Sequence, residues 1–256
     1  RDKLYKEDMS MKRLFESVSA FVLFVVMMSP LSLGAQAKSA DVSLITDAAS
    51  LEQGKMTVGV LLRIHDGMHI YWKNPGGETG FPTSVKWKLP DGAKVSDLQW
   101  MTPKSFKNAD DSLGIGYEGE VLLKAEIDTT AAKDKSAISA VVRWLACKDD
   151  ACFPGRAELQ LATSLEKAKA AEAVFKKFEH SFPVAAAPDV ASSAMGAGLT
   201  IVAPEEYDSA QFFPDSGVAL AEKKKTADGK FVFETKSKKG VLALSGKNGK
   251  KAFEVK

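Results

Sequence analysis

The chain has two cysteines, Cys147 and Cys152, which stand in the stretch RWLACKDDACFPG at 143–155 with four residues between them. Paired cysteines can form a structural disulfide, ligate a metal ion, or exchange thiols and disulfides with a partner. The Cys-x4-Cys spacing differs from the Cys-x-x-Cys of thioredoxin-like motifs. The residues themselves therefore leave the chemistry of the pair open.

Metal binding has the least support among these uses. A closed zinc site takes four ligands, and His65 and His69 are the nearest candidates to complete a set. On one straight strand these histidines would lie ~13 Å apart. Around a hairpin at Asp66-Gly67 they would fall on opposite faces. We therefore expect no metal and no other cofactor, with transient Cu(I) capture by the thiols as the remaining metal chemistry.

A structural disulfide and a redox pair are equally supported by the spacing. Closing so short a loop contributes only about 2 kcal/mol in the chain-entropy estimate. A sandwich with this much apolar sequence hardly requires that stabilisation, and exposed disulfides exchange readily.

The elements that must position the cysteines are short strands. Apolar and polar residues alternate along them, and β-branched and aromatic residues are frequent. Turn sequences such as Asn74-Pro75-Gly76-Gly77 separate them. This pattern predicts a mainly β chain with an antiparallel β-sandwich. A strand at 138–146 and another through Leu161 place both cysteines in, or at the root of, one hairpin loop. The other expected strands are 55–63, 68–72, 84–89 and 120–127.

A helix, a linker and a second, smaller β module are expected to follow. Thr163-Ser164-Leu165-Glu166 fits a capping box, and Ala171, Phe175, Phe178 and Phe182 then share one face, which indicates a packing stripe. The Ala/Pro/Ser-rich run to residue 197 is typical of a linker. We divide the chain into 1–37, upstream residues and signal peptide; 38–164, the cysteine-bearing sandwich; 165–198, helix and linker; and 199–256, the second module.

The amino end predicts export. Met11-Lys12-Arg13 is positive, the run 20–28 is apolar, and Ala35-Gln36-Ala37 offers a small-x-small cleavage pattern. The run is too short for a spanning helix. Export to an oxidising compartment allows the cysteines to pair. With 27% charged residues and a net charge of +2, neither nucleic acid nor an anionic surface is an expected obligatory partner.

Four stretches resemble the periplasmic amino-terminal domain of the DsbD thiol:disulfide interchange family, and ScsB-like members associated with copper tolerance most of all. They are HDGMHIYWKNPGGETGFPTSVKWKLPDG at 65–92, LQWMTPKSFK at 98–107, GYEGEVLL at 116–123 and WLACKDDACFP at 144–154. The resemblance covers roughly residues 40–165. The stretch AQFFPDSG at 210–217 and the closing β module resemble the second periplasmic domain of ScsB-like proteins more loosely.

The resemblance implies an immunoglobulin-like sandwich that relays electrons. Cys147 and Cys152 would accept electrons from a thioredoxin-like domain or protein, supplied by a membrane electron-transfer domain of the same full-length protein. They would then reduce periplasmic partners such as a disulfide isomerase or a thioredoxin-like protein of cytochrome maturation. This is oxidoreductase-type chemistry within a protein-disulfide reductase system. The chain would be periplasmic, and membrane-attached if it is a fragment of a transporter.

The resemblance also assigns roles to single residues. Cys152 would form the intermolecular bond, and the local sequence agrees, because Cys147 ends a strand and should be packed while Cys152 lies in the loop. Phe106 would be the aromatic of a cap, or an ordinary core side chain. Tyr71 and Trp72 would shield the site, or belong to the core. The cysteine spacing and Lys104-Ser105 in the cap depart from the family pattern.

Two functions of different classes fit the sequence. The first is the electron relay. The second is a β-sandwich binding or interaction module with a purely structural disulfide, linked to copper tolerance. The charges near the pair, with Lys148 and Arg156 favouring a thiolate and Asp149 and Asp150 disfavouring it, indicate a mild thiol.

Overall fold

The computed structural model describes residues 39–47, 54–77, 80–108, 110–134, 137–149, 151–162, 164–185, 191–195 and 198–255. These residues belong to one compact unit, Lys38–Lys256. The expected signal peptide at 1–37 lies outside the described residues. Among those described, no helix is both long and apolar enough to cross a bilayer.

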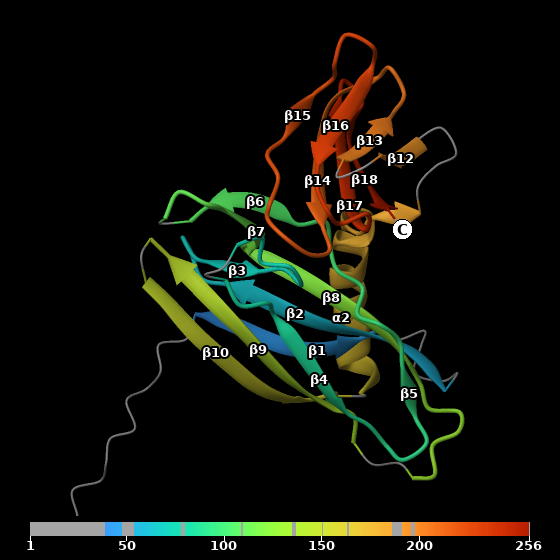
Figure 1. Cartoon of the computed structure of the whole chain (residues 1–256). Coiled ribbons are helices and arrows are strands. Elements are labelled where there is room, and N and C mark those ends of the chain that lie inside the picture. The colour runs from blue at the N-terminus through green and yellow to red at the C-terminus, as the bar shows by residue number, and fades with distance from the viewer. Residues whose placement is uncertain are drawn as a thin grey trace, which may run out of the picture. The chain divides into compact units, whose positions relative to one another are not determined.

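A first antiparallel sheet has the strand order β1-β2-β8-β5 (Figure 1). Its two long central strands pair from Lys55 opposite Asp128 to Arg63 opposite Glu120. Alternate residues of these strands point to opposite faces, and both faces are buried. The strand bounds are β1 Ala40–Thr46, β2 Lys55–Ile64, β5 Lys94–Val95 and β8 Glu120–Asp128.

A second antiparallel sheet has the order β10-β9-β3-β7-β6, with β4 also paired to β9 (Figure 1). The turn at Asp66-Gly67 does not make a hairpin within one sheet, because it carries the chain from β2 in the first sheet to β3 in the second. The strand bounds are β3 His69–Tyr71, β4 Ser84–Lys88, β6 Lys104–Lys107, β7 Leu113–Glu118, β9 Ser139–Lys148 and β10 Ala151–Gln160.

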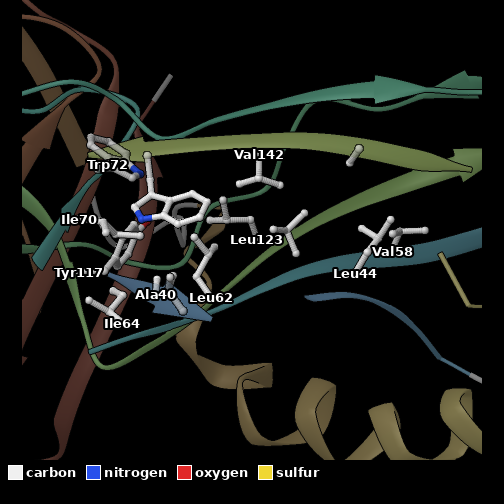
Figure 2. Close-up of a cluster of buried hydrophobic side chains, with 14 of the residues drawn as sticks. Ala40, Leu44, Val58, Leu62, Ile64, Ile70, Trp72, Tyr117, Leu123 and Val142 are labelled. Carbon is white, nitrogen blue, oxygen red and sulfur yellow. The ribbon is translucent and has the colours of Figure 1, made fainter. Parts of the chain in front are cut away.

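The core lies between these sheets. Leu62 of β2 and Leu123 of β8 meet Val142 of β9 and Ile70 of β3 in one buried cluster, which Figure 2 draws together with Trp72. On each strand alternate residues point toward the other sheet, and these side chains are among them. The predicted antiparallel β-sandwich is therefore confirmed, and burying its apolar side chains is the main stabilising contribution.

Helix α2, Leu165–Lys177, covers the outer face of the first sheet. Phe178 forms a buried cluster with Leu61 and Leu122, against which Phe175 and Phe182 pack, so the predicted packing stripe is confirmed. The N-cap differs from the capping box expected at Thr163, because Ser164 is the N-cap and accepts from the amide of Lys167. The α-helix ends at Lys177, before a short 3-10 turn at Glu179–Ser181, so Phe178 and Phe182 of the stripe lie beyond it.

The second module is β, as predicted, and has a separate aromatic core that includes Phe212, Phe231 and Phe233. Its strands order as β11-β18-β17-β14-β15 and β12-β13-β16. Strands β11 and β12 occupy part of the expected linker, because each pairs with a strand of the module. The bounds are β11 Val184–Ala185, β12 Ala191–Met195, β13 Gly198–Val202, β14 Tyr207–Pro214, β15 Lys223–Lys224, β16 Lys230–Glu234, β17 Gly240–Gly246 and β18 Gly249–Val255.

Candidate functional site

Cys147 and Cys152 form a disulfide across the β9–β10 hairpin. They are direct partners in the register, one pair before the turn, and their Cα atoms lie 4.1 Å apart. That spacing is close to the roughly 4.5 Å of a non-hydrogen-bonded antiparallel pair. The strands run to Lys148 and from Ala151, so Cys152 lies in a strand and not in the expected loop. Asp149 in the turn has the positive φ of 52° that two-residue hairpins favour.

The two sulfurs differ sharply in exposure. Cys147 is only 2% exposed, whereas Cys152 is exposed on β10, which ends the strand order of its sheet. Pro154 follows on the same strand, a position at which an edge strand tolerates the missing amide hydrogen. The geometry therefore presents one sulfur to solvent and buries the other.

Cys147 is buried although it points away from the core. On β9 the even residues, such as Ala146, enter the core, so Cys147 lies on the outer face of the sheet. Two side chains of β3 share that face. Tyr71 donates a hydrogen bond from its hydroxyl to Cys147 Sγ at 3.6 Å, and His69 is the direct cross-strand partner of Cys147.

Phe106 of β6 extends this aromatic group. Its ring centroid lies 3.9 Å from that of His69 and 5.6 Å from that of Tyr71. Glycines of β7 make room for the ring: a Cβ on Gly114 would stand 2.4 Å from Phe106 Cε2, and one on Gly116 would stand 3.0 Å from Phe106 Cε1. Phe106 is thus half-buried over the residues that flank Cys147.

A polar chain continues from Tyr71 into the turn between β6 and β7. The Tyr71 hydroxyl lies 3.3 Å from Asn108 Oδ1, and Asn108 Nδ2 donates to Ser112 Oγ at 3.0 Å. Ser112 in turn donates from its amide and its hydroxyl to Asp110. Burial, and then the negative charge of Asp110, raise the pKa of Tyr71, so its hydroxyl keeps the proton that it donates.

His69 is a site residue that the sequence reasoning did not assign to the pair. Its Nε2 atom is buried and has no hydrogen-bond partner among the described residues. Burial lowers the pKa of His69, and opposing Glu118 on β7 offsets this in part. The signal was present in the period-two pattern, because His69 and Tyr71 must share a face of one strand.

Trp72 is not brought to the disulfide. It is 0% exposed, and its side chain lies in the core between the sheets, where Figure 2 labels it among Ile70, Tyr117 and Val142. The reason is strand parity, since residue 72 must face the opposite way from Tyr71. Of the expected shielding residues, the structure therefore assembles Tyr71 and Phe106 near Cys147 and places Trp72 in the core.

One of the charged residues near the hairpin, Arg156, already has a partner. Arg156 forms an ion pair with Glu158 two residues along β10, and Asp150 lies outside the described residues. No group of three or more His, Cys, Asp or Glu side chains suited to a metal ion lies within the described ranges.

Comparisons with known proteins place this geometry in context. Residues 41–164 match the family described as thiol:disulfide interchange protein DsbD, N-terminal. No curated protein matched the chain. The N-terminal periplasmic domain of ScsB from Proteus mirabilis is similar in structure, with 18% identity and a TM-score of 0.61 over 85% of this chain and 92% of that one. The reduced N-terminal domain of DsbD from Neisseria meningitidis has 15% identity and a TM-score of 0.34 over 48% and 85%.

The family match spans the whole sandwich and includes both cysteines, Tyr71 and Phe106. The solved ScsB structure supports the fold over most of the chain, with the immunoglobulin-like sandwich that the resemblance implied. Residues 41–164 are an amino-terminal domain of the DsbD thiol:disulfide interchange protein family.

Proposed function

We propose that the chain relays electrons by thiol–disulfide exchange through Cys147 and Cys152. The observation that carries the proposal is the asymmetry of the disulfide, with Cys152 exposed on an edge strand and Cys147 buried beside the Tyr71 hydroxyl. An exposed sulfur can be attacked by a thiolate from outside. The buried sulfur then leaves next to the Tyr71 hydroxyl, which already donates a hydrogen bond to it.

The exchange balances in two steps. A thiolate of a thioredoxin-like donor attacks Cys152 Sγ, forming a mixed disulfide and releasing Cys147 as a thiolate. The donor's second thiolate then attacks the sulfur of the donor's first cysteine in the mixed disulfide, which releases Cys152 as a thiolate. Two electrons have moved, and the donor has become a disulfide.

Delivery to an acceptor reverses these roles. The Cys152 thiolate attacks the acceptor disulfide, and Cys147 resolves the mixed disulfide by attacking Cys152 Sγ. The exposed side chain of Phe153, beside Cys152, offers apolar surface to a docking partner. We infer a periplasmic disulfide isomerase or thioredoxin-like protein as the acceptor, and a thioredoxin-like domain, fed by a membrane electron-transfer domain, as the donor.

We place this chemistry in the periplasm after export by residues 1–37. The periplasmic location named for the ScsB domain supports this. In our proposed division, residues 38–164 carry the redox site, 165–198 connect, and 199–256 form the second module. Links to cytochrome maturation and copper tolerance are part of the same proposal.

Trapping of mixed disulfides tests the proposal. The Cys147→Ser chain should form a stable mixed disulfide with a thioredoxin-like partner whose own second cysteine is replaced by serine, because Cys152 stays exposed and neither protein keeps a resolving thiol. The matched Cys152→Ser chain keeps only the buried sulfur and should trap little, as read on non-reducing gels. Equal trapping by both variants, or none by either, would contradict the proposal and favour a purely structural disulfide.

A further inference from the structure

The second β module contacts two segments that adjoin or carry the aromatic residues of the site. One segment is the loop 73–77, which follows Tyr71 and Trp72 in the chain. The other is β6, which carries Phe106. The contacts come from β14 and the residues that follow it, up to Leu220, a stretch that the proposed exchange does not use.

Asn74 fixes the loop to the module. It is 8% exposed, and its Nδ2 donates to Pro214 O at 2.7 Å and to Gly217 O at 3.0 Å. Its Oδ1 accepts from Gly76 N at 3.1 Å, so every polar atom of the side chain is used. Ala219 N also donates to Gly76 O at 2.7 Å.

The packing at Gly76 is as close as its hydrogen bonding. Gly76 has a positive φ of 83°, and a Cβ there would stand 2.8 Å from both Ala219 Cβ and Ile115 Cγ1. Phe213 and Val241 of the module are buried within the same apolar cluster as the sandwich core. The loop is therefore pressed between the module and β7.

Gln211 fixes β6. Its Nε2 donates to Ser105 Oγ at 2.8 Å and to Leu220 O at 3.2 Å. Strand β6 has four residues and ends the strand order of its sheet, where β7 is its neighbour. A short edge strand is the kind of element that opens most readily. Ser105 and Phe106 are adjacent, so a contact that holds one restrains the other.

We propose that the second module is a clamp on the site, in which Asn74 and Gln211 are positioning residues that keep Phe106 against His69 and thereby keep Cys147 closed. The inference gives the module a part in the proposed function and rests on it for its purpose. Its test does not depend on exchange, because access to Cys147 can be measured with a small reagent alone.

The test uses the full chain with Cys152→Ser, in which Cys147 is the remaining thiol, and measures alkylation by iodoacetamide. Gln211→Ala and Ser105→Ala should each raise the alkylation rate about fivefold, the change expected from losing one net hydrogen bond. Because both changes remove the contact between Gln211 and Ser105, the double variant should equal Gln211→Ala alone. Asn74→Ala should raise the rate at least as much.

The matched control is Thr226→Ala, which loses hydrogen bonds at a turn of the same module. Its alkylation rate should not change. As a second measurement, amide hydrogen exchange of β6 in the oxidised chain should quicken in the Gln211 and Asn74 variants and stay constant in the control. An unchanged rate in the clamp variants, additive effects, or an equal rise in the control would overturn the clamp, whatever the outcome of trapping.

Discussion

At the scale of single residues, the site depends on which side chains share a face with Cys147. Tyr71 and His69 share it because they are two residues apart on β3, which lies between β9 and β7 in the sheet. Resemblance to the DsbD family suggested Tyr71 and Phe106 for this site, and the structure places both near Cys147. Adjacent residues of a strand face opposite ways, so Trp72 cannot join Tyr71 on this face and lies in the core.

Tyr71→Phe should slow reduction of the disulfide by dithiothreitol about fivefold, because the departing Cys147 thiolate loses its hydrogen-bond donor. The measurement is the pseudo-first-order rate at fixed pH. Tyr117→Phe is the matched control, since it loses a similar bond, to Met101 O, inside the core. Equal slowing in both variants would show that the Tyr71 hydroxyl has no particular role.

His69 should make stability depend on pH. Burial lowers its pKa below the ordinary 6.5, so the unfolded chain binds the proton more tightly than the folded one. The stability contribution is complete above 6.5 and is lost as the pH falls through 6.5 toward the lowered folded value. The urea midpoint of the parent chain should therefore fall between about pH 7.5 and about pH 5.5.

His69→Gln should reduce this fall, because the glutamine side chain does not titrate. His180→Gln, at an exposed position, should keep the fall of the parent chain. If the His69 variant lost as much stability on acidification as the parent, burial of the imidazole would not be the cause.

At the scale of elements, strands were more predictable than their ends. The alternation of apolar and polar residues indicates the strands of the sandwich. In the structure β9 runs to Lys148 and β10 begins at Ala151, so the strands are longer than expected and the connection has only two residues. Turn chemistry did not distinguish that tight turn from a longer loop. Strand β6 and its glycine partners were also beyond prediction, because pairing between β6 and β7 follows from tertiary packing.

Gly114→Ala tests the fit of β6 on β7. The new methyl group would meet the Phe106 ring, so the free energy of unfolding should fall by about 1–3 kcal/mol. In a Phe106→Ala background the same change should cost much less, because the ring is absent. Urea unfolding of the four chains gives the coupling. Additive losses would mean that Gly114 does not serve the ring.

At the scale of the whole molecule, the alternation of residues indicated β structure both around the cysteines and after the helix, and the structure has a buried cluster in each part. The contacts of Asn74 with Pro214 at the end of β14 and with Gly217 could not be inferred, because they join sites far apart in the sequence through a buried amide. The cysteine spacing did not distinguish thiol–disulfide exchange from a structural disulfide that contributes only about 2 kcal/mol to stability. The family resemblance gave the reason to favour exchange.

Whether Cys147 and Cys152 are a working redox pair can be measured by a redox titration of the full chain against glutathione, followed by the fraction of free thiols. A working pair should show a reversible two-electron transition at a potential above about −300 mV. A potential below about −300 mV, the range of structural disulfides in secreted proteins, would contradict the proposed exchange.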